Sequence, residues 1–599
     1  MPNGLTSNGS MLPVLPKQAM SMHARDGVRL DADVYFPDAE GSFPVLLMRQ
    51  PYGRAIASTV VYAPPSWYAA HGYIVVIQDV RGRGSSEGDF RLFAHEIEDG
   101  VDTANWAASL PNSTGQVGMY GFSYQGMTQI YAAIGYAKEL GVTDLSQTPL
   151  KAICPAMIGH DLYNDWAYEG GAFCLQMGWG WAVQLAAETA RREGDRHRYR
   201  QLYDAARSTP DFDPVSGRSP LLETLAPDSF YHDWLDNPSP DAPYWRSISP
   251  HSLMNDYPVD LPILHIGGWF DTYLRGTLRL YREMASCSQY LQSLIVGPWP
   301  HLPWGRHAGD LDFGSNLTSR VSSVDSLQIC WFNAFLKGPQ EELTNFKLDS
   351  SPLRLFLMGR GPLIKNDWAT LPSWPESIPT EYFLETSGLV PTMPQEGHLH
   401  QRRGEHDPLR LLSWETQDYD TLIHDPWRPV PALGGHATFP AGPKNRTILD
   451  ERTDILTYTI NAFQEHTIVA GDITVELYCK CDSPSFDLCA VLSNVYPDGR
   501  VYSMTQGYQR VTIPPSTTES VNEPFKVCIT LQSTCLGIQQ GHALRLSISG
   551  ACYPAYAVNP GTGILPGQSD VMDAQVITIE IHASEQYPSK IILPVVDAS

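Results

Sequence analysis

Ser123 lies in a turn rich in small residues, where its hydroxyl could act as a nucleophile. The turn reads Gly118-Met119-Tyr120-Gly121-Phe122-Ser123-Tyr124-Gln125-Gly126. An apolar run precedes it and apolar residues at helical spacing follow it, which predicts a strand, a sharp turn and a helix. This is the setting of a nucleophile elbow, which pushes a serine hydroxyl out beyond a sheet. The spacing is G-x-S-x-x-G rather than G-x-S-x-G because position 125 is Gln, so Ser123 needs support from other residues.

A serine attacks a carbonyl when a base accepts its proton and an acid orients that base. In α/β-hydrolases the acid and then the histidine follow the serine along the chain, each just after a strand. Asp271 follows an apolar run at residues 261–270, and His301 follows another at residues 292–300. Order, position and residue type together predict a catalytic triad of Ser123, Asp271 and His301. His265, which lies inside the first run, is predicted to be a core residue.

Acyl transfer also requires hydrogen-bond donors aimed at the developing oxyanion. The backbone N–H of Tyr124, the residue after the nucleophile, is one expected donor. The loop after an early apolar run at residues 44–49 carries Tyr52, whose phenol could be the second. From the residues alone, a packing role for Tyr52 is favoured.

The elements that must position these residues alternate between buried strands and helices. Apolar runs at residues 44–49 and 73–79, with a helix predicted over 96–110, favour an α/β sheet of mainly parallel strands. Residues 158–250 are helical and aromatic and predict a cap, whereas short alternating strands from about residue 351 predict a β-sandwich or jelly roll. The predicted domains are an α/β-hydrolase core of residues 1–157 and 251–350, a helical cap of 158–250, and a jelly roll of 351–599.

The composition excludes some classes of partner. The formal net charge is −24 and the pI is about 5.1, which disfavours nucleic acid and anionic membranes. The first residues lack the basic start and apolar stretch of a secretory signal, and no apolar run approaches the roughly 20 residues that span a bilayer. We therefore expect a cytoplasmic protein with a small-molecule substrate. Exposed jelly-roll edges would allow a homodimer.

No metal site and no cofactor are predicted. Three cysteines occur in strand-like sequence and are interpreted as buried thiols: Cys479, Cys481 and Cys489. Three histidines occur in a polar stretch and are interpreted as exposed loop residues: His398, His400 and His406. The glycines of residues 82–88 depart from a dinucleotide fingerprint, since the third comes one place late. Asp79 also follows a buried run, but it precedes the serine and is interpreted as structural.

Several stretches together resemble the cocaine esterase, X-Pro dipeptidyl-peptidase and α-amino acid ester hydrolase family of serine hydrolases. They are Arg49-Gln50-Pro51-Tyr52, residues 79–88, the Ser123 turn, Gly268-Trp269-Phe270-Asp271, Gly297-Pro298-Trp299-Pro300-His301, and residues 494–499 and 541–546. The resemblance implies an α/β-hydrolase core, a helical cap and a C-terminal jelly roll. It implies Ser123, Asp271 and His301 as the triad, and the Tyr52 hydroxyl with the Tyr124 N–H as the oxyanion hole. The family elbow, G-x-S-Y-x-G, also accounts for Gln125.

The substrate positions depart from part of this family. Its amino acid ester hydrolases carry carboxylates just after the triad Asp, where this chain has Thr272-Tyr273-Leu274. Three cap acids could hold a substrate ammonium, although a solvated helix face explains them about as well: Asp161, Asp165 and Glu169. The aromatic cap predicts a bulky, largely apolar acyl or alcohol group. The candidate pocket residues are Trp166, Tyr168, Phe173, Trp269 and Phe270.

These observations predict a serine hydrolase that cleaves an ester or an amide through an acyl-enzyme. The nearest alternative is an acyltransferase that uses the same triad and passes the acyl group to an alcohol or amine. A more distant alternative is a non-catalytic binding protein in which the jelly roll is the recognition module.

Overall fold

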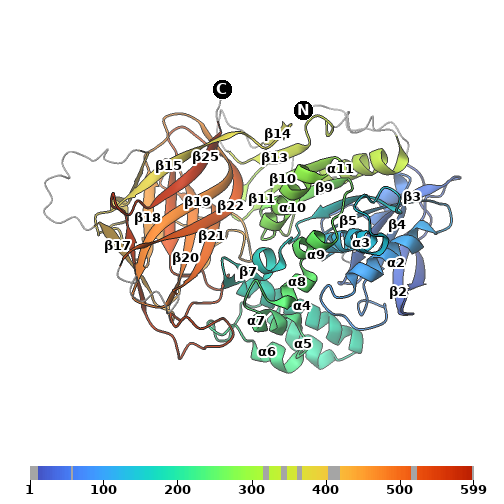
Figure 1. Ribbon diagram of the computed structural model, residues 1–599, viewed down its shortest axis with the longest axis horizontal. Helices are drawn as coiled ribbons and strands as arrows, with labels where there is room; N and C mark the ends of the chain where they lie inside the picture. Colours follow the sequence, from blue (N-terminus) through green and yellow to red (C-terminus); the bar gives the residue numbers. More distant parts are fainter. Residues whose placement is uncertain are drawn as a thin grey trace.

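The computed structural model describes residues 11–55, 59–314, 323–338, 347–359, 367–401, 418–513 and 523–596. An α/β half and a β half lie side by side, and a group of helices lies below them in the view of Figure 1. Within the described residues, no helix is both long and apolar enough to cross a membrane.

The α/β half is built on a ten-stranded sheet in the order β1-β2-β4-β3-β5-β6-β9-β10-β13-β14. The strands are β1 (Gln18–His23), β2 (Arg29–Tyr35), β3 (Phe43–Gln50), β4 (Ile74–Asp79), β5 (Ser113–Phe122), β6 (Leu150–Ala156), β9 (Ile263–Phe270), β10 (Gln292–Pro300), β13 (Leu353–Leu357) and β14 (Asp367–Leu371). Neighbours from β4 to β13 are parallel, whereas the pairs β1–β2, β2–β4 and β13–β14 are antiparallel. The carboxyl ends of the parallel strands therefore meet at one edge of the sheet.

Helices cover both faces of this sheet, as the continuous apolar strands predict. Alternate residues of β3 show the division: Leu46 and Met48 belong to one hydrophobic core, and Val45 and Leu47 to the other. The first core includes residues of α1 (Pro65–Ala70) and α11 (Ser323–Phe332), and the second includes residues of α2 (Glu96–Ala108) and α3 (Tyr124–Leu140). Full burial of each such aliphatic side chain contributes about 1.5–3 kcal/mol to folding.

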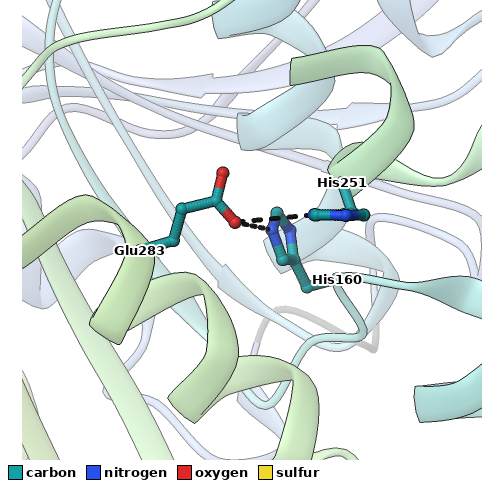
Figure 2. Close-up of side chains that lie close together, drawn as sticks. All are labelled: His160, His251 and Glu283. Carbon is teal, nitrogen blue, oxygen red and sulfur yellow. Dashed lines mark hydrogen bonds and ion pairs between the residues drawn. The ribbon is translucent and has the colours of Figure 1, made fainter. Parts of the chain in front are cut away.

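The cap interrupts the sheet between β6 and β9. Its elements are η2 (Tyr163–Ala167), β7 (Tyr168–Glu169), β8 (Ala172–Phe173), α4 (Leu175–Glu193), α5 (Arg196–Ala205), α6 (Pro220–Leu225), α7 (Phe230–Asp236), α8 (Pro243–Ile248) and α9 (Pro250–Asp256). Aromatic rings fill its interior, including Trp181, Phe230 and Trp234. The segment after β6 and the start of α9 also meet α10 (Leu274–Cys287) through His160, His251 and Glu283 (Figure 2).

The β half is a second, largely antiparallel sheet of eleven strands. They are β15 (Ser377–Glu385), β16 (His398–His400), β17 (Tyr419–His424), β18 (Ile455–Ile460), β19 (Thr467–Cys481), β20 (Ser485–Val495), β21 (Val501–Thr512), β22 (Phe525–Ile538), β23 (Ala543–Ser549), β24 (Ile577–His582) and β25 (Lys590–Val596). As expected, Cys479, Cys481 and Cys489 are buried free thiols in β19 and β20.

Two features differ from the sequence-based expectations. Strands β13 and β14 lie beyond the boundary predicted at residue 351, yet they extend the first sheet, because Leu353 pairs with Leu294 of β10. An alternating pattern does not reveal which sheet edge a strand joins. In addition, His398 and His400 form strand β16 rather than a loop, and His400 Nε2 lies 2.6 Å from the Glu385 carboxylate. His406 lies outside the described residues.

Candidate active site

Four candidate residues follow four parallel strands at the same edge of the first sheet. Tyr52 comes after β3, Ser123 after β5, Asp271 after β9 and His301 after β10. This edge is where α/β folds gather ligand-binding and reacting groups. The residues are distant in sequence, and the strand order brings them together.

Ser123 occupies a strained backbone conformation between β5 and α3. Its φ of 59° and ψ of −127° lie outside the regions that non-glycine residues favour. Two glycines allow this tight turn. A Cβ atom on Gly121 would lie 2.4 Å from Cβ of Gln125, and a Cβ atom on Gly126 would lie 2.4 Å from Cγ2 of Ile158. The predicted turn between strand and helix thus has the backbone of a nucleophile elbow.

Asp271 and His301 form a direct hydrogen-bonded pair. Nδ1 of His301 lies 2.8 Å from Oδ1 of Asp271, and the carboxylate is fully buried whereas the imidazole is 20% exposed. Donation from Nδ1–H to the carboxylate leaves Nε2 as the acceptor nitrogen. The ring of Phe122, which precedes Ser123, lies 5.6 Å from the imidazole centroid. The imidazole therefore lies beside the Ser123 turn.

The Tyr52 phenol contacts the nucleophile directly. Its oxygen accepts a hydrogen bond from Nε1 of Trp181 at 3.1 Å and shares one with the Ser123 hydroxyl. Burial raises the pKa of Tyr52 to about 12, although these two hydrogen bonds oppose the rise. Tyr52 thus keeps its proton near neutral pH and can act as a donor. Tyr124 is the first residue of α3, and the backbone N–H groups in the first turn of a helix have no partner within the helix.

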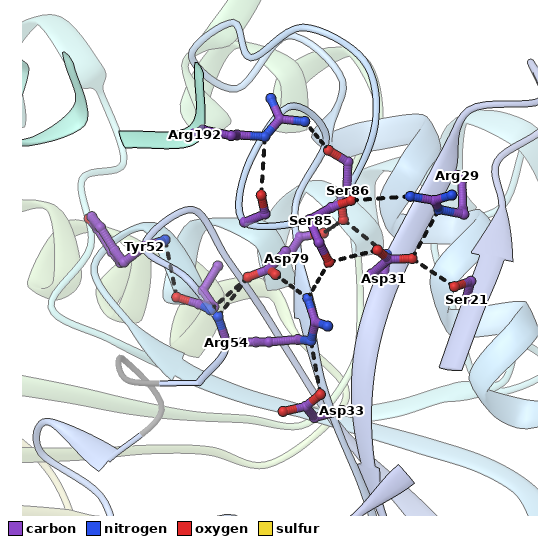
Figure 3. Close-up of polar contacts among 12 residues, drawn as sticks. Ser21, Arg29, Asp31, Asp33, Tyr52, Arg54, Asp79, Ser85, Ser86 and Arg192 are labelled. Carbon is purple, nitrogen blue, oxygen red and sulfur yellow. Dashed lines mark hydrogen bonds and ion pairs between the residues drawn. The ribbon is translucent and has the colours of Figure 1, made fainter. Parts of the chain in front are cut away.

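A polar network holds the loop that carries Tyr52 (Figure 3). The Tyr52 N–H donates to Oε1 of Gln50 at 3.1 Å, and Nε2 of Gln50 donates to Asp79 at 3.2 Å. Asp79 also accepts from the backbone N–H of Arg54 at 2.6 Å and from its guanidinium at 2.5 Å. The Arg54 guanidinium also donates a hydrogen bond to Asp33 at 2.9 Å. Asp79 therefore fixes both ends of the Tyr52 loop, which agrees with its structural interpretation.

The side chain of Tyr124 is anchored below the elbow. Its hydroxyl donates to Glu96 of α2 at 2.7 Å, and Glu96 also pairs with the buried Arg49 at 2.5 Å. Its ring stacks on Phe93 with a centroid distance of 4.8 Å. These contacts fix the first turn of α3, and with it the direction of the Tyr124 N–H.

Of the five candidate pocket residues, the structure brings Trp166 to this group. The Trp166 ring packs against Tyr273 at 4.2 Å, and Tyr273 packs against the His301 imidazole at 5.0 Å. Trp166 also lies 5.3 Å from Trp181, the donor to Tyr52. Sequence reasoning did not single out Trp181 or Tyr273 as site residues, since no local pattern separates them from the other aromatic residues nearby.

The other four pack elsewhere in the described structure. In the cap, Tyr168 donates to the Trp234 carbonyl at 2.9 Å, and Phe173 packs against Tyr231 at 5.4 Å. In β9, Trp269 donates to the Phe356 carbonyl of β13 at 2.7 Å, and its own carbonyl accepts from Gln532 of β22 at 3.0 Å. The Phe270 ring lies 6.1 Å from Phe313.

The three cap acids already have partners. Asp161 accepts from the Tyr163 N–H at 3.1 Å, and Asp165 accepts from the Asp161 N–H at 2.8 Å. Glu169 is buried between the core and the β half. Its carboxylate lies 2.8 Å from Arg275, 2.9 Å from His436 and 2.5 Å from the Tyr556 hydroxyl. The alternative of a solvated helix face is wrong for Asp165 and Glu169, because both side chains are buried.

The charge of Glu169 is stabilised by this arrangement. Burial opposes ionisation, but the charges of Arg275 and His436 and the hydrogen bonds from His436 and Tyr556 outweigh it and lower the pKa of Glu169 to about 2. A carboxylate already compensated by an arginine is a poor site for a second cation.

Comparisons with known proteins agree with this architecture. Residues 26–303 match the family model described as X-Pro dipeptidyl-peptidase (S15 family), and residues 345–592 match the X-Pro dipeptidyl-peptidase C-terminal non-catalytic domain. The chain is 29% identical over 593 residues to the cocaine esterase of Rhodococcus sp., covering 96% of this chain and 97% of that protein.

Two solved structures share the fold over their whole length. An aminopeptidase from the marine sediment archaeon Thaumarchaeota archaeon superposes with a TM-score of 0.76 at 19% identity, covering 100% of this chain and 99% of that one. An α-amino acid ester hydrolase superposes with a TM-score of 0.73 at 21% identity, covering 99% and 98%. The predicted α/β-hydrolase fold with a C-terminal β domain is confirmed. Because the two family models together account for most of its length, the chain belongs to the X-Pro dipeptidyl-peptidase S15 family of serine hydrolases.

Proposed function

We propose that this serine hydrolase cleaves an ester with a bulky, largely apolar acyl or alcohol group, and that Ser123 carries the acyl-enzyme. The observation that carries the proposal is the meeting of Ser123, the Asp271–His301 pair and the Tyr52 phenol at one sheet edge. The similarity to a cocaine esterase supports an ester of this kind.

Each group has one step in the proposed reaction. His301 accepts the Ser123 proton through Nε2 as the hydroxyl oxygen attacks the carbonyl carbon. The Tyr52 O–H and the Tyr124 N–H donate to the oxyanion that forms, and Asp271 stabilises the imidazolium through Nδ1–H. The imidazolium then protonates the leaving alcohol. Water, deprotonated by His301, releases the acyl group and restores Ser123.

The surroundings support an apolar substrate over a cationic one. The rings next to the reacting groups belong to Trp166, Trp181 and Tyr273. The residues after the triad Asp carry no carboxylate, and Glu169 is compensated by Arg275. Aromatic surfaces with few polar groups are typical of sites for apolar ligands.

A fluorophosphonate probe tests the catalytic role of Ser123. We expect the probe to label the wild type and the exposed-serine control Ser208→Ala, but not Ser123→Ala. Failure to label folded wild-type protein would contradict the proposed catalysis and favour the binding-protein alternative.

A substrate screen then tests the chemistry of the substrate. Aryl and bulky polycyclic esters should have a higher kcat/KM than aminoacyl esters, and a preference for aminoacyl esters would contradict the apolar substrate. Product analysis with competing alcohols and amines separates the two acyl-enzyme alternatives: the free acid is expected, and an acylated competitor as the main product would indicate an acyltransferase.

A further inference from the structure

Two histidines and a glutamate from three separate segments point toward one another at the junction of the cap and the core (Figure 2). His160 follows β6, His251 lies in the first turn of α9, and Glu283 lies on α10. One ligand atom from each residue lies within 4.8 Å of the other two. The His160 side chain is fully buried, whereas His251 and Glu283 are 44% and 34% exposed.

The hydrogen bonding of this group is incomplete. Oε2 of Glu283 lies 2.8 Å from Nε2 of His160 and 3.5 Å from Nδ1 of His251, so one carboxylate oxygen faces two imidazole nitrogens. Nδ1 of His251 is buried and has no hydrogen-bond partner among the described residues, even though it points toward this oxygen. A cation between the three atoms would give that nitrogen a partner.

We propose that His160, His251 and Glu283 bind a divalent transition-metal ion of the Zn²⁺ type. Two neutral imidazoles and one carboxylate are ligands that Zn²⁺ accepts, and three protein ligands leave a position for water. The partial exposure of His251 and Glu283 places that position toward solvent. This ion is independent of the acyl chemistry, since none of its ligands belongs to the Ser123 site.

Two of the three ligand separations lie close to those of a tetrahedral site. Metal–ligand bonds of about 2.0–2.2 Å in a tetrahedral site place the ligand atoms about 3.3 Å apart. The separation of His251 and Glu283 is already 3.5 Å, and that of His160 and Glu283 would widen by about half an ångström from 2.8 Å. Rotation of the half-exposed Glu283 side chain can supply this movement.

The neighbouring charges leave the three ligands available. Arg279 lies one turn before Glu283 on α10, and its guanidinium is 3.3 Å from Asp165 and 3.6 Å from Asp161. These acids therefore compensate the nearby cation, and Glu283 faces the two histidines.

Metal binding would fasten the cap to the core. His160 and His251 flank the cap in sequence, and Glu283 belongs to the helix that begins shortly after Asp271. An ion that binds the folded chain raises its thermal stability by mass action.

Titration of metal-stripped, tag-free protein with Zn²⁺ tests the site, and Co²⁺ serves as a spectroscopic substitute. We expect one equivalent to bind, a visible Co²⁺ absorption band, and a Tm that rises with Zn²⁺ concentration. His251→Ala and Glu283→Gln should each weaken binding at least 10-fold and abolish the rise in Tm. His197→Ala, which removes an exposed cap histidine, should change neither.

Circular dichroism of each variant establishes that it is folded before titration. Since His251 and Glu283 are both partly exposed, their variants should fold without metal. Absence of stoichiometric binding up to millimolar Zn²⁺ would overturn the proposal. Equal affinity in the wild type and His251→Ala would do the same. Fluorophosphonate labelling of Ser123 is expected in metal-free protein, so the two proposals fail separately.

Discussion

Two of the carboxylate–histidine pairs in the described structure have nearly equal lengths but very different surroundings. Asp271 lies 2.8 Å from His301, and Glu169 lies 2.9 Å from His436. His301 is 20% exposed beside the nucleophile, whereas His436 is 2% exposed between the core and the β half. The first pair therefore has access to a substrate, and the second does not.

The two pairs also differ in the groups that neutralise the charge of the carboxylate. Glu169 is also bound by Arg275 and Tyr556, and Nη1 of Arg275 lies 3.2 Å from Nε2 of His436. Nε2 of His436 would have to accept the proton if this histidine were a general base, but this nitrogen already contacts both Arg275 and Glu169. In the Asp271 pair, the carboxylate binds Nδ1 and leaves Nε2 for the nucleophile. The same two residue types can therefore give a general base or a structural contact, depending on exposure and neighbouring cations.

The substitution Asp271→Asn is expected to give the largest effect. The amide keeps the shape but stabilises the wrong imidazole tautomer, so kcat should fall about 10⁴-fold. The measurement is kcat for an ester that the wild type hydrolyses, together with the thermal midpoint. A loss below tenfold in a folded variant would remove Asp271 from the proposed triad.

The matched substitution Glu169→Gln should affect stability rather than catalysis. Removal of one partner from a buried ion pair leaves Arg275 uncompensated, which should lower the free energy of unfolding by about 3–5 kcal/mol. Denaturant unfolding measures this loss, and kcat of the folded fraction should stay within about threefold of the wild type. A large fall in kcat with unchanged stability would break the contrast between the pairs.

The substitution Tyr52→Phe tests whether catalysis requires the Tyr52 phenol in addition to the Asp271–His301 pair. Loss of one oxyanion donor should lower kcat by about 10²–10³-fold, or about 2.7–4 kcal/mol of transition-state stabilisation. KM should change little if the phenol acts mainly in the transition state. An unchanged kcat would show that the phenol serves packing, the interpretation that the residues alone favour.

The pH dependence of the free energy of unfolding should also distinguish the buried Glu169 pair, with a smaller effect than the substitutions above. The pKa of Glu169 is about 2 in the folded protein, against 4.5 for an ordinary glutamate. Below pH 4.5 the unfolded chain therefore binds a proton that the folded chain does not, and stability falls as the pH falls toward 2. At pH 3 this group should account for a loss of about 2 kcal/mol relative to pH 7. The comparison is urea unfolding of the wild type and Glu169→Gln at both pH values, and identical pH slopes would contradict the assignment.

Sequence reasoning was strongest where local pattern and chain order act together. Ser123, Asp271 and His301 each follow an apolar strand, and parallel strands bring their carboxyl ends to one edge, so these residues could be selected before the structure was known. The fold class followed from the same alternation. Their catalytic roles stay predictions until the substitutions are made.

The contacts that escaped prediction are made between distant segments. Glu169 and Tyr556 are 387 positions apart, and no periodicity relates them. The cluster of His160, His251 and Glu283 is likewise assembled by packing, whereas His398 and His400, interpreted as exposed loop residues, are neighbours in a local sequence pattern. The role of Trp181 depends on the direction of its indole N–H toward Tyr52, which composition does not encode.

The hydrogen bond between Tyr52 and Ser123 has a consequence for experimental control of the rate. A backbone amide cannot be altered by ordinary mutagenesis, but the Tyr52 donor is a side chain specified by a single codon. Incorporation of ring-fluorinated tyrosines at this position would vary the acidity of the phenol while nearly preserving its shape. Variants with different fluorotyrosines at position 52 would therefore form a graded series of catalysts. The dependence of their rate on phenol acidity would measure how much charge the donor receives in the transition state.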